Sequence, residues 1–319
     1  MGDGLSPLAM IIVTFRSADV IGRCLESIEA SDGPPMRIVV VDNASDDRTV
    51  SIIQEHMCRA SRHRIELVRA EENLGFAAGV NRGLEHLFRD PAVKWFWVLN
   101  PDCVVPRETP GHLLRAVEAA GRFSLMGTRT LYADRPHLVQ ADGGTVSPLT
   151  GACRLMNRGA DVSAPRPAVG TIDFISGACM VASREFVERA GPMNEDYFLF
   201  YEEVDWAMRR GDLPLAYCRD AQVHHGAGSS TGSASAGRAA SGFANYFNFR
   251  GRTMFVLRHR PVVLPLAFAY AMMQVGRIFV RDGWIAGWGA FCGCLRLPPP
   301  RFVRARIGKR SGPIGPVGT

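Results

Sequence analysis

Four apolar runs rich in β-branched residues divide the first hundred residues of this chain, and helical patterns lie between them. The segments between the runs repeat apolar residues at three- and four-residue spacing, which is typical of a helix that covers a sheet with one face. Strands that alternate with helices in this way predict an α/β fold with parallel strands, and such sheets bind ligands beyond the carboxyl ends of their strands. The runs cover residues 9–15, 37–42, 65–69 and 94–99.

Polar side chains stand at the ends of two of these predicted strands. Asp42 closes the second run, and Asn100 and Asp102 follow the fourth in the sequence Asn-Pro-Asp. A carboxylate at the first place can accept hydrogen bonds from a pyrimidine or a ribose, and the oxygens at the second can hold Mg²⁺ or Mn²⁺. Asn-Pro-Asp also occurs as a plain turn. Its place after a buried strand favours a cation site that bridges two phosphates.

A histidine is predicted as a third ligand of that cation. His224 follows a short strand-like run, residues 221–223, and precedes a Gly-rich segment. Its neighbour His225 is the nearest alternative. A structural role for either imidazole is the simpler interpretation.

Three acids begin a predicted helix directly after a run of aromatic residues. They are Glu202, Glu203 and Asp205. Acids in a first helical turn stabilise the helix dipole. Apolar walls would also raise the pKa of such a carboxyl toward the range in which it can remove a proton from a hydroxyl. We predict Glu203 as this general base, with Glu202 and Asp205 as alternatives.

A further group of residues is predicted to contact a nucleotide. The block 73–82 supplies small residues that let the backbone approach a ligand, although glycines that serve helix packing alone give the same pattern. Residues at the ends of the early strands complete the group. The predicted nucleotide contacts are Thr14, Phe15, Arg16, Asp42, Asn43, Asn73, Gly75, Phe76, Gly79, Asn81 and Asn100.

The pattern is less regular after residue 122. We expect strands at 123–131, 138–146 and 171–183 and a short helix at 184–190. The Pro-, Gly- and Arg-rich segment 147–170 is predicted to be a mobile loop.

The end of the chain differs in charge from the rest. Residues 250–310 hold eleven Arg and one Lys against one acid, a balance of +11, while the first 249 residues carry 25 basic and 30 acidic groups, a balance of −5. Two apolar stretches, 261–276 and 283–295, are shorter than the roughly 18 to 20 residues that span a bilayer. Basic charge with short apolar stretches favours a segment that lies on an anionic membrane surface. Helices packed on the catalytic domain, with solvated arginines, are the alternative.

We therefore divide the chain into a catalytic domain, residues 1–242, and a C-terminal helical basic tail, residues 243–319. The Gly-, Ser- and Ala-rich segment 226–242 is predicted to be a flexible lid over a ligand. Nucleic acid is not expected as a partner, because the catalytic part is acidic and carries no recognised motif. A nicotinamide oxidoreductase is not expected either, since no Gly-x-Gly-x-x-Gly follows the first strand.

The eight cysteines are scattered and form no Cys-x-x-Cys pair. This distribution predicts reduced thiols in a cytoplasmic protein rather than a disulfide frame or a zinc site. The first residues do not have the pattern of a secretion signal.

Seven blocks, in this order, resemble glycosyltransferase family 2, whose members have the GT-A fold, a Rossmann-like mixed sheet flanked by helices. The blocks cover residues 8 to about 260. The forms Asn-Leu-Gly-Phe and Leu-Asn-Pro-Asp are most similar to bacterial rhamnosyltransferases of cell-wall and surface-polysaccharide assembly. The blocks are Ile11-Ile-Val-Thr-Phe15, Val40-Val-Asp-Asn-Ala-Ser45, Asn73-Leu-Gly-Phe-Ala-Ala-Gly-Val-Asn81, Leu99-Asn-Pro-Asp102, Ile175-Ser-Gly-Ala-Cys-Met180, Phe198-Leu-Phe-Tyr-Glu-Glu-Val-Asp205 and Val223-His-His-Gly226.

The resemblance implies an inverting displacement from dTDP-L-rhamnose to a sugar on a polyprenyl diphosphate, at the cytoplasmic face of the membrane. Asp42 would bind the base, and Asn100 and Asp102 would lie at the metal and diphosphate. The family's Glu-Asp pair becomes Glu202-Glu203 here, so Glu203 would be the base. The alternatives are a UDP-sugar-dependent transferase of the same family and an inactive nucleotide-binding scaffold, because Asn100 and Glu203 depart from the family pattern.

Overall fold

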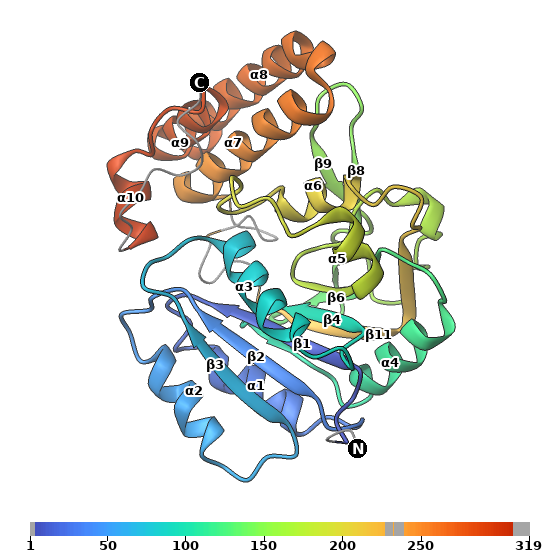
Figure 1. Cartoon of the computed structure of the whole chain (residues 1–319). Coiled ribbons are helices and arrows are strands. Elements are labelled where there is room, and N and C mark those ends of the chain that lie inside the picture. The colour runs from blue at the N-terminus through green and yellow to red at the C-terminus, as the bar shows by residue number, and fades with distance from the viewer. Residues whose placement is uncertain (1–3, 227–231, 233–238, 309–319) are drawn as a thin grey trace.

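Within the described residues, nine strands form one mixed sheet at the centre of the computed structural model (Figure 1). The structure describes residues 4–226, 232 and 239–308. The early strands are β1 (Leu8–Thr14), β2 (Arg37–Asp42), β3 (Arg64–Arg69) and β4 (Trp95–Leu99). They lie parallel in the order β3-β2-β1-β4, as the alternating sequence pattern predicts.

Later strands extend the sheet beyond β4 and make it mixed. The order continues with β10 (Cys179–Ser183), β6 (Leu125–Tyr132), β11 (Ala216–His225) and β5 (Cys103–Val104). β10 is antiparallel to β4 and β6, β11 is parallel to β6, and β5 is antiparallel to β11. β7 (Val139–Ala141) pairs with β6 off this path. The predicted α/β class with a mixed sheet is therefore confirmed.

Helices cover both faces of the sheet, and the strand residues alternate between them. In β1, Met10 and Ile12 pack toward one set of helices, while Ile11 and Val13 pack toward the other. Because both faces are covered, the central strands are apolar throughout. The first set is α1 (Ile21–Glu29), α2 (Thr49–Met57) and α4 (Thr109–Ala119), and the second is α3 (Phe76–Phe88), α5 (Arg184–Ala190) and α6 (Glu202–Met208).

The middle of the chain departs from the sequence prediction in three places. The strand expected at 138–146 is split into β7 and β8 (Gly144–Val146), because the chain bends at Gly143, whose φ is 82°. The expected loop at 147–170 contains β9 (Cys153–Leu155), which pairs with β8. The strand expected at 171–183 is only β10, since Phe174 forms an isolated antiparallel bridge with Gly144 of β8 rather than a pair with the central sheet.

The C-terminal helices pack together above the sheet, next to α6 (Figure 1). They are α7 (Gly242–His259), α8 (Leu264–Asp282), α9 (Trp284–Cys294) and α10 (Arg301–Ile307). α7 contacts each of the other three. The domain boundary placed between residues 242 and 243 stays a prediction.

One expectation about these helices is wrong. The stretch 261–276 was expected to be too short to span a membrane, but the helical segment Pro261–Asp282 is 22 residues long with a mean hydropathy of 1.6. The helix continues past Gly276 because Ile278 and Phe279 pack against α7 and α9. By length and composition this segment could cross a membrane, and 17% of it is buried within the protein. The predicted lid, 226–242, falls largely outside the described residues.

Candidate active site

A cavity of about 1360 Å³ lies between the carboxyl ends of the sheet strands and the C-terminal helices. Thr14 of β1, Asn43 after β2 and Asn100 after β4 all line it. This is the sheet edge at which α/β folds bind ligands, because several strands end there together. Glu203 of α6 and residues of α7 and α8 line the same cavity.

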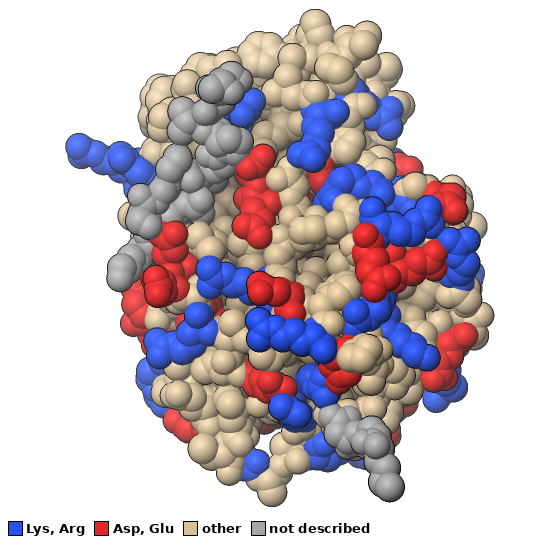
Figure 2. All heavy atoms as spheres, in the orientation of Figure 1, with Lys and Arg blue, Asp and Glu red and all other residues tan. Residues whose placement is uncertain are grey.

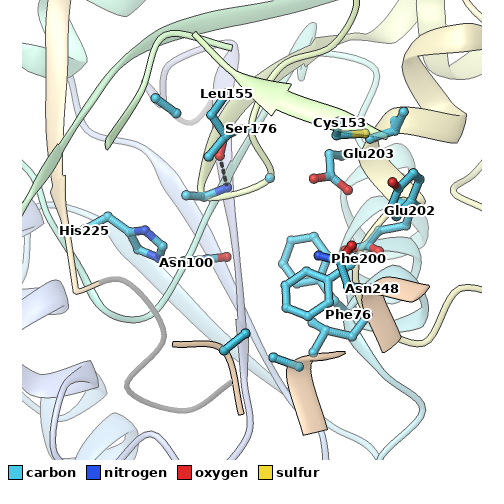
Figure 3. Close-up of a pocket in the computed structure, with 18 of the residues that line it drawn as sticks. Phe76, Asn100, Cys153, Leu155, Ser176, Phe200, Glu202, Glu203, His225 and Asn248 are labelled. Carbon is cyan, nitrogen blue, oxygen red and sulfur yellow. Dashed lines mark hydrogen bonds between the residues drawn. The ribbon is translucent and has the colours of Figure 1, made fainter. Parts of the chain in front are cut away.

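Two groups of functional side chains face each other across the cavity. Figure 3 shows His225 and Asn100 on one side, and Glu202, Glu203 and Cys153 on the other. The first group can hold a cation and the second can exchange a proton. The sequence predicts both groups, but only the fold brings them to one cavity.

Asp102 and His225 form the cation side of the site. The Oδ1 atom of Asp102 lies 3.0 Å from Nε2 of His225, and Nδ2 of Asn100 lies 3.2 Å from the same nitrogen. Such spacing suits ligands that share one ion, provided that the Asn100 amide turns its oxygen inward. A carboxylate, an imidazole and an amide are a ligand set that Mn²⁺ and Mg²⁺ accept.

The surroundings of His225 prepare its Nε2 atom for a metal. Nδ1 of His225 lies 2.7 Å from Oε1 of Gln140, which can only accept, so a neutral imidazole that keeps its proton on Nδ1 would offer the Nε2 lone pair to a metal. The Cys103 thiol is also nearby. Burial, and then the charge of Asp102, raise the pKa of Cys103 well above its usual value. Cys103 does not line the cavity, and its thiol donates to the carbonyl of Ala178 at 3.4 Å.

The structure places His225, the alternative to the predicted ligand His224, beside Asp102. Consecutive residues of β11 point to opposite faces of the sheet, so only one of the two histidines can reach Asp102. His225 lines the cavity and His224 does not. Burial lowers the pKa of His224, and the charge of Arg23 in α1 lowers it further, which places this imidazole on the α1 side.

Glu202 and Glu203 form the acidic side of the site. Both line the cavity, and each has a buried Oε2 atom without a hydrogen-bond partner among the described residues. Burial raises the pKa of Glu203 to about 7. Burial and the nearby charge of Glu203 raise the pKa of Glu202 well above its usual value. Burial thus favours the protonated form of both carboxyls, and Glu203 can exchange a proton near neutral pH.

A strained turn presents these two acids. Phe200 and Tyr201, immediately before α6, both have positive φ angles, 66° and 73°. Non-glycine residues rarely adopt this conformation, and surrounding contacts must hold it. The Tyr201 hydroxyl donates to the carbonyl of Gly151 at 2.9 Å and anchors the turn.

Asp205 does not belong to the reactive group. Its carboxylate accepts from Nε of Arg209 at 2.9 Å and lies 2.8 Å from Nε2 of His259 in α7. Burial acts to raise the pKa of Asp205, but His259 and the neighbouring arginines outweigh it, and the pKa is lowered. A carboxylate held this way is a poor proton acceptor. Asp205 instead joins α6 to α7.

Asp42 is a predicted nucleotide contact, but its carboxylate already accepts hydrogen bonds from within the protein. Asp42 is fully buried, and its oxygens accept from the hydroxyl of Thr14 at 3.0 Å and from the backbone and hydroxyl of Ser45 at 3.0 and 2.6 Å. It does not line the cavity, whereas the adjacent Asn43 does. Oδ1 of Asn43 is buried without a partner among the described residues.

The loop before α3 is built around Gly75. Nδ2 of Asn43 donates to the Gly75 carbonyl at 2.9 Å, and Oδ1 of Asn73 accepts from the Gly75 N–H at 3.0 Å. Gly75 has a φ of 92°, and a Cβ there would lie 2.3 Å from the carbonyl oxygen of Phe198. A glycine is therefore required by both backbone and space.

Of the other predicted nucleotide contacts, some line the cavity and some do not. Phe15, Arg16 and Phe76 line the cavity with those above. Gly79 and Asn81 do not: a Cβ on Gly79 would lie 2.4 Å from the Val13 side chain, so this glycine serves helix packing. Asn81 bonds instead to the backbone of Met193, at 2.8 and 2.9 Å.

Sequence reasoning missed the wall that the C-terminal helices contribute. It includes Asn248 and Arg252 of α7 and Gln274 and Arg277 of α8. These residues have no local motif, since their role depends on how α7 and α8 pack over the sheet. The one signal was the excess of arginine after residue 250, which we assigned to a membrane.

The fold is that of GT-A glycosyltransferases. The mannosyltransferase PcManGT from Pyrobaculum calidifontis, solved with GDP-Man and Mn²⁺, matches it with a TM-score of 0.54 at 16% identity, over 95% of this chain and 86% of that chain. The sequence model of Glycosyl transferase family 2 matches residues 9–190. The chain therefore belongs to glycosyl transferase family 2.

Two characterised proteins are similar in sequence. The N-acetylglucosaminyl-diphospho-decaprenol L-rhamnosyltransferase of Mycobacterium tuberculosis is 26% identical over 253 residues, which cover 70% of this chain and 78% of that protein. The low-salt glycan biosynthesis hexosyltransferase Agl10 of Haloferax volcanii is 24% identical over 227 residues, which cover 69% and 67%. The family resemblance to bacterial rhamnosyltransferases is thus confirmed.

Proposed function

We propose that this chain is an inverting transferase that moves L-rhamnose from dTDP-L-rhamnose to a saccharide carried on a polyprenyl diphosphate. One observation carries the mechanism: a carboxyl with a pKa near neutrality, Glu203, shares a cavity with the Asp102–His225 pair. The similarity to a rhamnosyltransferase of a lipid-linked acceptor supports the choice of donor and acceptor.

Glu203 acts as the general base. Its carboxylate takes the proton of the acceptor hydroxyl, whose oxygen then bonds to the anomeric carbon of the donor sugar as the bond to the diphosphate breaks. Attack from the face opposite the leaving group inverts the anomeric centre. The proton stays on Glu203 until it passes to solvent, and a pKa of about 7 allows both steps. Burial and the charge of Glu203 favour the protonated form of Glu202, which limits the negative charge beside the base.

Asp102 and His225, with Asn100, are the residues that would hold a divalent cation. Mg²⁺ or Mn²⁺ there supplies positive charge to the donor diphosphate as it departs. Gln140 keeps the imidazole of His225 in the tautomer that this role needs. On the nucleotide side, the free Oδ1 of Asn43 supports a contact with the base, and the buried Asp42 holds the neighbouring backbone.

The C-terminal helices support a place at the inner face of the cell membrane, where lipid-linked acceptors are found. α8 and α9 expose large apolar side chains, and Figure 2 shows few charged residues over the part of the molecule that these helices form. An exposed apolar area of this kind is typical of an interaction surface.

The test is a panel of dTDP, UDP, GDP and dTDP-L-rhamnose, each with Mn²⁺ or EDTA, read as the melting temperature of the full chain. A ligand at 100 times its dissociation constant adds about 2.7 kcal/mol to the free energy of unfolding. We expect dTDP with Mn²⁺ to raise the melting temperature more than UDP. Transfer to a lipid-linked saccharide is then measured with the preferred donor.

Other outcomes discriminate among the alternatives. A preference for UDP would contradict rhamnose and keep the family and the base. Binding of a nucleotide without transfer to any acceptor or to water would favour an inactive scaffold. Stabilisation that is equal in EDTA would contradict the role given to the cation.

A further inference from the structure

A buried arginine that has no anionic partner among the described residues lines the cavity on the side of the C-terminal helices. Arg252 of α7 is only 6% exposed, and its guanidinium lies over the rings of Phe249 and Tyr270, 4.6 and 5.8 Å from their centroids. Nη1 donates to Oε1 of Gln274 in α8 at 2.6 Å. Nη2 is buried and has no partner among the described residues.

Burial of the Arg252 guanidinium costs free energy unless a ligand provides an acceptor for Nη2. A guanidinium withdrawn from water needs an anion or a full set of acceptors. Among the described residues, its side-chain partner Gln274 is neutral, and no acidic side chain pairs with Arg252. The ring contacts hold the guanidinium plane in place, which leaves Nη2 ready to donate to an anion in the cavity.

A second cation lies on the neighbouring helix. Arg277 follows Gln274 by three residues on α8, so the two share a face, and both line the cavity. Arg277 is exposed, unlike Arg252. Arg281, four residues further along, also lines the cavity but is paired with Asp282 at 2.8 Å. The cavity therefore has a buried and an exposed arginine on the same wall.

This wall adjoins the general base rather than the cation side. Cys153 of β9 lines the cavity next to Glu203 (Figure 3). A Cβ on Gly151, two residues before Cys153, would lie 3.5 Å from Cγ of Arg252. The carbonyl of Gly151 accepts from the hydroxyl of Tyr201, two residues before Glu203. Arg252 and the turn that carries Glu203 therefore both contact the chain beside Cys153. An acceptor whose hydroxyl meets Glu203 would extend toward Arg252.

We propose that Arg252, assisted by Arg277, binds the phosphates that join the acceptor saccharide to its lipid. The inference rests on the proposed function and names a separate subsite within it. The donor diphosphate belongs to the Asp102 side, so the cavity has two phosphate positions on opposite walls. A guanidinium binds two phosphate oxygens in parallel, which positions the sugar as well as holding it.

The first experiment measures binding without the donor. Geranyl diphosphate, a prenyl diphosphate that carries no sugar, is titrated in EDTA against the full chain, with inorganic diphosphate and phosphatidylglycerol vesicles as separate arms. We expect Arg252→Gln to weaken geranyl diphosphate binding at least about tenfold, since hydrogen bonds to charged groups are strong. Arg277→Gln should weaken it by a smaller factor. Arg304→Gln, an exposed arginine of α10 outside the cavity, is the matched control.

The second experiment measures transfer. The same saccharide is offered on an alkyl diphosphate and as an alkyl glycoside without phosphate. The wild type should prefer the diphosphate form, and Arg252→Gln should reduce that preference at least about tenfold by raising the acceptor KM, while the donor KM holds. Arg252→Lys keeps the positive charge but lacks the paired N–H donors of a guanidinium, so it should lose part of the preference for the diphosphate form.

Three results would overturn the proposal. The first is equal binding of geranyl diphosphate by Arg252→Gln and the wild type. The second is an equal loss of that binding in Arg304→Gln. The third is a loss of binding confined to phosphatidylglycerol vesicles, which would assign the arginine to membrane lipid. If Arg252→Gln does not fold, Arg277→Gln decides, because an exposed side chain carries little of the core. If dTDP-L-rhamnose fails to bind while geranyl diphosphate binding depends on Arg252, the donor assignment fails and this subsite stands.

Discussion

At the scale of single residues, the site depends on two neighbouring glutamates whose pKa values differ. Burial raises the pKa of both residues, that of Glu203 to about 7, and the charge of Glu203 raises the pKa of Glu202 further. Coupled carboxyls of this kind divide the roles of acid and base between them. The sequence shows two equal acids, and only their surroundings separate them.

We predict that the transfer rate rises with pH through an apparent pKa of about 7, because the reaction needs the Glu203 carboxylate. Glu203→Gln should lower kcat by about 10² to 10⁴ while the donor still binds. Glu202→Gln is the control and should lose far less, since an amide resembles a protonated carboxyl. The pH profile of kcat/KM checks this, and a flat profile between pH 5 and 8 would contradict it.

The same pKa has a consequence for folding stability. The folded-state pKa of Glu203 lies above the unfolded value of 4.5, so its protonated form is favoured in the fold. Relative to Glu203→Gln, the wild type should lose stability as pH rises from about 4.5 through about 7. Parallel urea unfolding of both proteins measures the difference. An unchanged difference over this range would mean that the carboxyl is not buried.

At the scale of single elements, the register of β11 decides which histidine lies beside Asp102. His225 pairs with Cys103 of β5 and faces Asp102, while His224 faces the other side of the sheet. Strand alternation predicts that only one of the two can take part, but it does not say which. The pairing with the two-residue strand β5 settles it, and that strand was not foreseen from the sequence.

The two histidines form a matched pair of variants. His225→Ala should remove most of the Mn²⁺-dependent rise in melting temperature that a nucleoside diphosphate produces. Mutation of residues around a bound metal typically lowers metal affinity 10- to 100-fold. His224→Ala should keep that rise. A thermal-shift titration of both proteins checks this. Loss of the rise in His224→Ala alone would contradict the assigned cation site.

Prediction from sequence was thus accurate where local pattern decides and poor where distant packing decides. The early strands and α5 follow from apolar spacing alone. Asp205 looked like a candidate base, but His259, more than fifty residues later, neutralises that role. Likewise Arg252 of α7 lines the cavity, and α7 is joined to α6 by the contact between His259 and Asp205, which no spacing in the chain encodes.

At the scale of the whole molecule, the C-terminal helices contribute side chains both to the wall of the cavity and to an exposed apolar surface. Arg277 of α8 lines the cavity, while Val280 on the same helix is 90% exposed to solvent. Trp284 and Ile285 of α9 are 71% and 60% exposed. Apolar side chains gathered at the end of one helix and the start of the next form a small continuous surface that a bilayer can cover.

We predict that the triple variant Val280→Ser, Trp284→Ser, Ile285→Ser binds anionic vesicles at least about tenfold more weakly than the wild type, because each large apolar side chain contributes about 1.5–3 kcal/mol when buried. Leu149→Ser removes an equally exposed side chain from another part of the surface and is the control. Cosedimentation with phosphatidylglycerol vesicles measures the effect. Equal binding by all three proteins would assign these side chains to a protein partner.

One hydrogen bond links the loop before α3 to the C-terminal helix α10. Nδ2 of Asn73, whose oxygen holds the Gly75 turn, donates to the carbonyl of Ile307 at 2.9 Å, so the last helical turn of the described chain is fastened to the loop that begins α3. A shortened chain that ends before α10 would keep every cavity residue of the sheet. It would nevertheless lose the bond between Asn73 and Ile307, so the C-terminal helix supports a loop more than two hundred residues away.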